Sequence, residues 1–211
     1  MSDWTDISRI PTQDLLKEVA GRPDLTDAGV MTKELFDIIV GQIPILCVDV
    51  ILVRFENGRI EAGFITRNTG FYKGRYWMVG GRVRKNEGLE QALQRHVQET
   101  LGVRPKGLAF SGVLGQYLQD LVEAEQLGFG HEPAKHAVAP ICVATLEVGE
   151  LVFGSTAHGG QEASALHWFS VLELPPADCF CYGGYGFIRA ALDSPAARQF
   201  FCKIKPIPAT V

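Results

Sequence analysis

Apolar and polar residues recur along the chain with two different periods, which predict strands in some segments and helices in others. Mostly apolar runs from Ile45 to Phe55 and from Ile60 to Thr66, joined by Asn57-Gly58, predict a β-hairpin. Apolar residues three and four apart between Leu89 and Leu101 predict a helix that buries one face. The remaining expected elements are strands near 76–79, 108–117, 137–146 and 166–169, and helices over 12–20, 33–40 and 187–192.

The order of these elements decides the expected fold class. Strands and helices interleave along the chain, so we expect an α/β or α+β fold in which helices cover a central mixed β-sheet. The segment 119–136 is longer than an ordinary connection and is expected to be a loop that determines specificity.

Composition and charge narrow the classes of protein further. Of 211 residues, 46% are apolar and 21% are charged, which is typical of a globular domain. The net charge of -4 supplies no overall basic field, so we expect no nucleic-acid partner. The longest apolar run, from Ile43 to Val53, is too short to span a bilayer and contains Asp49, so we expect no membrane partner.

The cysteines and the N-terminus bear on the cellular compartment. The chain starts Met-Ser-Asp-Trp-Thr-Asp, with acids where a secretion signal would carry lysines. Its five cysteines are an odd number without a zinc-site spacing, so we interpret them as reduced and mostly buried thiols. Both observations favour a cytoplasmic protein.

One segment carries most of the candidate chemistry: Gly80 to Glu87, followed by Arg95 to Val103. Its paired glycines allow a backbone to approach a ligand closely. Glu99 follows Arg95 by four residues and shares a helix face with it, with His96 alongside. Glu87 lies just before the helix, where it can face the positive end of the helix dipole or form a structural ion pair with Arg95.

This segment resembles the Nudix box, G-x5-E-x7-R-E-U-x-E-E-x-G-U, in which U is a bulky aliphatic residue. It departs from the pattern at His96 and Thr100, each of which replaces a glutamate. The resemblance implies a Nudix-like α/β/α sandwich with a central mixed sheet and a hydrolase that uses divalent metal. The seven matching positions of the nine are Gly81, Glu87, Arg95, Val97, Glu99, Gly102 and Val103.

A longer stretch is similar to the GDP-mannose mannosyl hydrolase branch of the same superfamily. The likeness rests on 36–40, Pro44, 48–51, Arg67-Asn68, Tyr76-Trp77 and Gly80 to Val83 with Lys85 and Glu87. It implies that Asp49, Arg67 and Arg82 contact a nucleotide sugar or its diphosphate, and that the protein is a homodimer. We accordingly divide the chain into an N-terminal extension (1–33), a Nudix domain (34–172) and a C-terminal helical extension (173–211).

The resemblance also implies a metal site. Glu162 precedes Trp168 by six residues, the spacing at which many Nudix proteins place a last carboxylate ligand. Glu99, Glu162 and the carbonyl oxygen of Gly80 then form the expected ligands of one Mg²⁺, with Mn²⁺ as an alternative ion, since both prefer oxygen donors.

Several roles stay open at this stage. His96 is either a general base or a residue that fills the space of the missing glutamate, and His158 is a second candidate base. Asp49 either contacts the ligand or forms a structural hydrogen bond, because a lone buried carboxylate is costly. Arg67 and Arg82 are suited to bidentate phosphate contacts, and we predict a catalytic role for Arg82 as well.

Two functions from different classes follow. The first is a Mg²⁺-dependent Nudix hydrolase that cleaves a nucleoside diphosphate linked to another moiety, with a nucleotide sugar such as GDP-mannose as the first candidate. The second is a catalytically impaired Nudix-fold module that binds such a ligand without hydrolysing it. In either case the apolar face of the helix expected over 33–40 favours a homodimer.

Overall fold

The computed structural model describes residues 43–68, 72–118, 136–154 and 163–205. The helices expected over 12–20 and 33–40, and most of the segment 119–136, lie outside these described residues. The domain division stays a prediction.

A long β-hairpin opens the described part of the chain. Strand β1 (Ile45–Glu56) is antiparallel to β2 (Arg59–Arg67), with Phe55 opposite Ile60. Asn57 and Gly58 both have positive φ angles, 49° and 79°, as the predicted Asn-Gly turn requires. The hairpin of the sequence prediction is therefore confirmed.

The sheet branches on one edge of β1. The second half of β1 pairs with β2, whereas its first half pairs with β4 (Val79–Arg82), and β6 (His136–Leu146) runs parallel to β1 along the other edge. The outer strands are β3 (Tyr76–Trp77), β5 (Pro105–Leu118) and β7 (Ala163–Ser170). Pairings of both directions occur, so the sheet is mixed, as expected.

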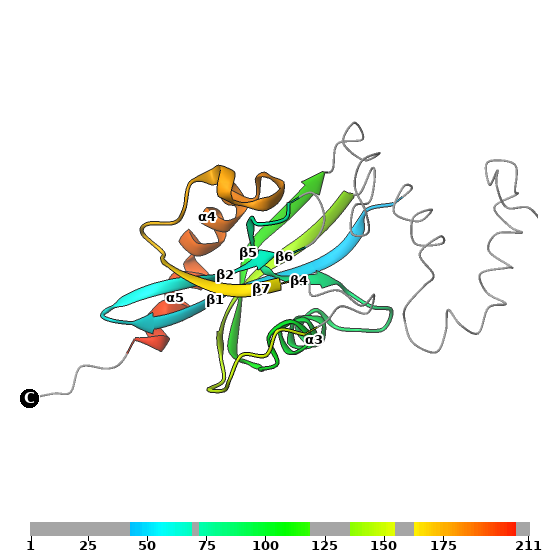
Figure 1. The fold of residues 1–211 in the computed structure, drawn as a ribbon. Coiled ribbons are helices and arrows are strands. Elements are labelled where there is room, and N and C mark those ends of the chain that lie inside the picture. The colour runs from blue at the N-terminus through cyan, green and yellow to red at the C-terminus, as the bar shows by residue number, and fades with distance from the viewer. Residues whose placement is uncertain (1–42, 69–71, 119–135, 155–162, 206–211) are drawn as a thin grey trace, which may run out of the picture. The chain divides into compact units, whose positions relative to one another are not determined.

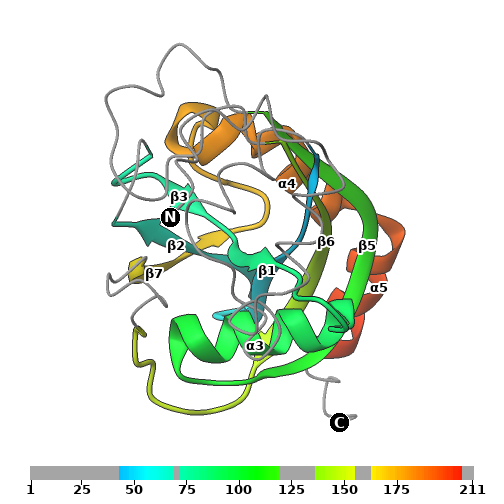
Figure 2. The same cartoon turned by 90° about the vertical axis from the view of Figure 1, so that its right-hand side faces the viewer.

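Helices lie on both sides of this sheet. Helix α3 (Leu89–Leu101) packs on β4 and β1, and α4 (Tyr185–Asp193) packs on β5 and β6 on the opposite side (Figures 1 and 2). Helix α5 (Pro195–Ile204) packs along β5. The arrangement is the α/β/α sandwich that the sequence predicted.

A single apolar core joins the sheet to its helices. Helix α3 contributes Ala92, Leu93, Val97 and Leu101, which are the apolar positions of its predicted buried face. The largest fully buried side chains include Phe64, Phe180, Ile51, Leu52 and Met78. Periodicity located this core because the buried face of α3 repeats every three to four residues.

The structure differs from the expected elements in two places. The strand expected at 76–79 is interrupted at Met78, since β3 pairs with β2 while β4 pairs with β1. Helix α5 was not expected. It begins with Pro195, and Ser194 caps it by accepting a hydrogen bond from the Ala197 amide at 3.1 Å. Two short 3-10 turns, Ala177–Cys179 (η4) and Cys181–Gly183 (η5), precede α4.

Two further properties of the described residues concern their helices and their cysteines. No helix among them combines the length and the apolar character that a membrane crossing needs. All five cysteines are described and none forms a disulfide; Cys47, Cys142 and Cys181 are buried. Three of the five thiols are therefore buried, as expected.

Candidate functional site

The candidate site is built where strand β4 turns into helix α3. Gly80 and Gly81 lie in β4, opposite Asp49 and Val48 of β1. A Cβ atom on Gly80 would lie 2.2 Å from the Asp49 Oδ1 atom, and one on Gly81 would lie 2.5 Å from the His96 Cε1 atom. Only glycine allows both close approaches, so the two glycines set the spacing between strand, helix and buried carboxylate.

Glu87 and Arg95 hold the connecting loop against α3. The Arg95 Nε atom donates to Glu87 Oε1 at 2.7 Å, and Nη2 donates to Oε2 at 2.8 Å. The Arg84 amide also donates to Glu87, at 2.8 Å. These hydrogen bonds, Arg95 first, lower the pKa of Glu87 to about 2. The predicted pair thus forms a bidentate ion pair that keeps Glu87 charged.

Arg95 also connects this pair to the rest of the site. Its Nη2 atom donates to the Arg82 carbonyl oxygen at 3.0 Å, and its Nη1 atom donates to Glu99 Oε2 at 3.2 Å. The Glu99 side chain is 49% exposed, and its other oxygen lies 3.5 Å from a guanidinium nitrogen of Arg84. Glu99 therefore presents a half-exposed carboxylate at the surface of α3, oriented by Arg95.

His96 lies between the same groups. Its Nε2 atom is 3.0 Å from the Arg82 carbonyl oxygen, and its Nδ1 atom is 3.5 Å from Arg95 Nη1. The carbonyl only accepts and the guanidinium only donates, so both contacts are satisfied by the neutral tautomer with its proton on Nε2. This arrangement ties the imidazole to the glycine turn.

Asp49 occupies a buried position on β1, on the edge shared with β4. It is 4% exposed. Burial raises the pKa of Tyr117, on β5, and the nearby Asp49 carboxylate raises it further. Burial, with a contribution from Asp49, also raises the pKa of the Cys142 thiol, to about 12. Asp49 and Tyr117 are thus neighbours across the sheet although the sequence separates them widely.

Arg67 has different surroundings. It is the last residue of β2. The start of β2 pairs with the second half of β1, and β4 pairs with the first half of β1, so the end of β2 that carries Arg67 lies outside the β1 pairing. Its guanidinium carbon lies 5.8 Å from the centre of the Tyr182 ring. Arg82, in contrast, is exposed at the end of β4, opposite Cys47.

The remaining predicted site residues are not all described. Glu162 and His158 lie outside the described residues. No group of three or more His, Cys, Asp or Glu side chains gathers within the described ranges at a spacing that would hold a metal ion. Of the predicted metal ligands, the structure describes the half-exposed Glu99 carboxylate and Gly80.

Sequence reasoning missed three residues of this region: Arg84, Tyr117 and Tyr182. Arg84 belongs to a variable position of the box, and Tyr117 reaches Asp49 only because β5 and β1 both flank β6. An aromatic residue in a glycine-rich segment was the available signal for Tyr182, and it did not indicate a contact with Arg67.

Comparison with known proteins agrees with this geometry. The NUDIX domain family model matches residues 45–189, which is more than half of the chain. No curated protein matches.

Solved structures share the fold at low sequence identity. The NUDIX domain of Shewanella oneidensis NrtR, crystallised with ADP-ribose, is 15% identical, covering 81% of this chain and 99% of that chain with a TM-score of 0.52. A possible asymmetric diadenosine tetraphosphate hydrolase from Jonesia denitrificans is 21% identical, covering 79% and 99%, with a TM-score of 0.53.

A third structure is similar to the same extent. The MutT NUDIX hydrolase from Burkholderia pseudomallei is 22% identical, covering 71% of this chain and 97% of that chain with a TM-score of 0.50. Sequence identities this low show a shared fold and nothing more. The family match over 45–189 carries the assignment. The chain therefore belongs to the Nudix domain family, and this membership assigns it to the Nudix-type hydrolases.

Proposed function

We propose that this protein is a Mg²⁺-dependent hydrolase of a nucleoside diphosphate linked to another moiety, with a nucleotide sugar as the first candidate. The observation that carries the proposal is the position of Glu99. The Glu87–Arg95 ion pair fixes the loop to α3, and Arg95, which also donates to the Arg82 carbonyl next to Gly81, orients the half-exposed Glu99 carboxylate. Precise placement of a reacting diphosphate requires a rigid connection of this kind between loop and helix.

The donor set suits a hard cation. Mg²⁺ prefers oxygen ligands and is commonly held by one or two carboxylates together with substrate phosphates. Glu99 supplies one carboxylate, the Gly80 carbonyl is a second oxygen, and Glu162 completes the proposed set. A bound Mg²⁺ or Mn²⁺ would supply charge neutralisation of the diphosphate and orientation of a water molecule.

Each of the other site residues is assigned a role in the reaction. Arg82 is exposed at the end of β4, where its carbonyl oxygen accepts from Arg95, and it is assigned to the phosphate that leaves. Arg67, at the end of β2, and Asp49, on β1, bind the substrate. His96 or His158 accepts the proton of the attacking water. In the conformation of the structure His96 engages Arg82 and Arg95, so it serves as a base only after leaving one of these contacts.

The substrate class can be tested directly. The protein is incubated with GDP-mannose, UDP-glucose, ADP-ribose and a diadenosine polyphosphate, each with and without Mg²⁺. Attack at phosphorus releases a nucleoside monophosphate and a sugar phosphate, whereas attack at the sugar carbon releases a nucleoside diphosphate and free sugar. We expect Mg²⁺-dependent products from at least one nucleotide sugar. Turnover of the dinucleotide alone would contradict the nucleotide-sugar assignment.

A binding module without hydrolysis is the second candidate, favoured by one observation. His96 and Thr100 replace two box glutamates, and the Glu99 carboxylate is shared between Arg95 and Arg84. In this case a ligand from the same panel would bind tightly and remain intact after prolonged incubation at high enzyme concentration. Product formation that survives repurification and disappears in a Glu99 variant would exclude this candidate.

Two further properties belong to this proposal. We propose a homodimer, on the basis of the predicted apolar helix over 33–40, which lies outside the described residues. We also propose a reducing, cytoplasmic environment, since five cysteines that form no disulfide suit it.

A further inference from the structure

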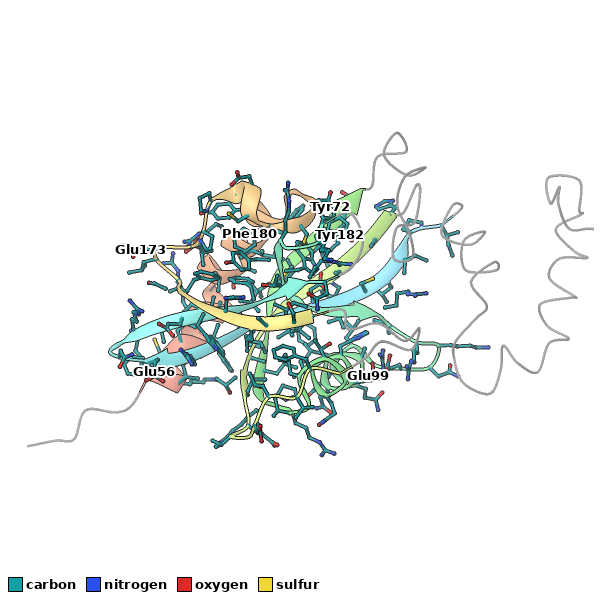
Figure 3. The ribbon with its side chains drawn as sticks, in the orientation of Figure 1. Glu56, Tyr72, Glu99, Glu173, Phe180 and Tyr182 are labelled. Carbon is teal, nitrogen blue, oxygen red and sulfur yellow. The ribbon has the colours of Figure 1, made fainter. Side chains whose placement is uncertain are left out.

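Tyr182 stands out among the residues that the proposed function does not use. It belongs to η5, which precedes α4 and lies beyond residue 172, where the sequence predicted the Nudix domain to end, but within the residues 45–189 that the family model matches. Its side chain is half-buried and reaches back to the sheet. Figure 3 shows Tyr182 beside Tyr72 on the α4 side of the sheet, whereas Glu99 lies on α3 on the other side.

The Tyr182 ring is the centre of an aromatic cluster. Its centroid lies 4.4 Å from that of Tyr72, 5.2 Å from that of Trp77 and 6.0 Å from that of Tyr117. The rings are tilted or perpendicular to one another, which is the favourable geometry for aromatic contacts. These three neighbours come from the β2–β3 connection, β3 and β5, so the position of the ring is fixed from several elements.

One face of this fixed ring lies near Arg67. The guanidinium carbon is 5.8 Å from the ring centre, within the range of a cation–π interaction. The backbone around Arg67 is also held, because its amide donates to the Arg75 carbonyl at 3.0 Å and its carbonyl accepts from Gly74 at 2.8 Å. The backbone contacts fix the chain, and the ring limits where the guanidinium can point.

The backbone of Tyr182 gives an independent observation. Its φ and ψ angles are 54° and 23°, in the left-handed region that non-glycine residues rarely adopt. This conformation is adopted by a tyrosine although two glycines, Gly183 and Gly184, follow it directly. Strain of this kind persists where the surroundings determine the conformation, and here it directs the ring towards Trp77 and Arg67.

We propose that Tyr182 is a positioning residue for Arg67: its ring, on the α4 side of the sheet, limits the directions in which the Arg67 guanidinium can reach a bound diphosphate. The inference rests on the phosphate-binding role given to Arg67 in the proposed function. It adds that η5, which follows the last strand of the sheet, preorganises that contact and so determines affinity for the diphosphate group.

The test measures binding of inorganic pyrophosphate, at fixed Mg²⁺, to the full chain by calorimetry. The variants are Tyr182→Asn, Tyr182→Phe, Arg67→Ala and the Arg67→Ala/Tyr182→Asn double variant. Asparagine removes the ring but tolerates the left-handed backbone, and phenylalanine keeps the ring. We expect about three- to tenfold weaker binding for Tyr182→Asn, and affinity within about twofold of wild type for Tyr182→Phe.

A matched control removes another ring of the same cluster. Phe187 contacts the Tyr117 ring at 5.9 Å between centroids, and no contact between Phe187 and Arg67 is described. Phe187→Leu therefore loses similar packing but should bind pyrophosphate within about twofold of wild type. Thermal unfolding of every variant shows which fraction is folded, and affinities are compared per folded protein.

The double variant separates the possible failures. If Tyr182 acts through Arg67, Tyr182→Asn causes no further loss of affinity once Arg67 is alanine. Additive losses would overturn the positioning role and leave the proposed function intact. Unchanged affinity in Arg67→Ala would overturn both this inference and the phosphate role of Arg67. An equal loss in Phe187→Leu would show that general packing, and not the ring over Arg67, is responsible.

Discussion

At the residue scale, the charge of Glu87 decides how the loop is joined to α3. The two oxygens of this carboxylate accept from the Arg95 guanidinium and, in part, from the Arg84 amide. Hydrogen bonding to Arg95 lowers the pKa of Glu87 from 4.5 to about 2. Because the folded pKa lies below the ordinary value, the pair stabilises the fold above about pH 4.5. That stability is lost as the pH falls through about 2.

We predict that Glu87→Gln destabilises the protein by about 3 kcal/mol at pH 7, since lowering a pKa by one corresponds to about 1.4 kcal/mol and the Glu87 pKa falls from 4.5 to about 2. The difference in unfolding free energy between variant and wild type should shrink by more than half at pH 3. Urea unfolding at both pH values measures it. A difference that stays constant between pH 7 and pH 3 would show that the carboxylate charge is not what stabilises the joint.

Sequence reasoning worked for contacts of this kind and failed for others, for a physical reason. Glu87 and Arg95 are eight residues apart, and a helix begins between them, so local geometry restricts how they can meet. Asp49 and Tyr117 meet only after three strands, β1, β6 and β5, have been ordered in the sheet. Periodicity predicts the elements, but it does not predict which distant side chains face each other across them.

At the scale of elements, the packing of α3 on β4 depends on the absence of a side chain at Gly81. A Cβ atom there would lie 2.5 Å from His96 Cε1 and 2.9 Å from Nε2. The helix and the strand would have to separate, or the imidazole would have to leave the Arg82 carbonyl. His96 thus fills the space between the two elements.

We predict that Gly81→Ala destabilises the fold by about 1–3 kcal/mol through this overlap. The double variant Gly81→Ala/His96→Ala should be less destabilised than the sum of the two single variants, because removal of the imidazole makes room for the methyl group. Chemical unfolding of the four proteins completes the cycle. Strictly additive effects would mean that the two residues are not in contact in solution.

Helix α5 provides a second test at this scale. The Ser194 hydroxyl accepts from the Ala197 amide, so Ser194→Ala should cost about 1 kcal/mol of stability. Ser194→Gly should cost only a few tenths of that, since glycine tolerates the cap geometry. Equal losses in thermal unfolding would contradict a capping role. This Ser-Pro start was readable in the sequence, but the expected helix over 187–192 ended before it and no second helix was expected.

At the scale of the whole molecule, the charge distribution favours a small anion over a polymer. The net charge is -4 over 211 residues. Cationic groups concentrate locally, at Arg82, Arg84 and Arg95 around the loop and at Arg67 on β2. A diphosphate contacts a few such groups, whereas a duplex requires a long basic surface.

We therefore predict no measurable association with duplex DNA at about 150 mM salt, where screening removes weak electrostatic attraction. Fluorescence anisotropy of a labelled duplex of mixed sequence measures it, with pyrophosphate as a competitor. Saturable binding that pyrophosphate does not displace would contradict the prediction and indicate a separate nucleic-acid surface.

The most direct test of the central proposal is the Mg²⁺-dependent turnover of a nucleotide sugar by Glu99→Gln, with Glu90→Gln as the matched control. Glu90 is an exposed carboxylate in the first turn of the same helix, outside the candidate site. We predict that Glu99→Gln lowers kcat/KM at least 100-fold while the control stays within about twofold, a difference of about 2.7 kcal/mol in transition-state stabilisation. Full Mg²⁺-dependent turnover by Glu99→Gln would contradict the assignment of this carboxylate to catalysis.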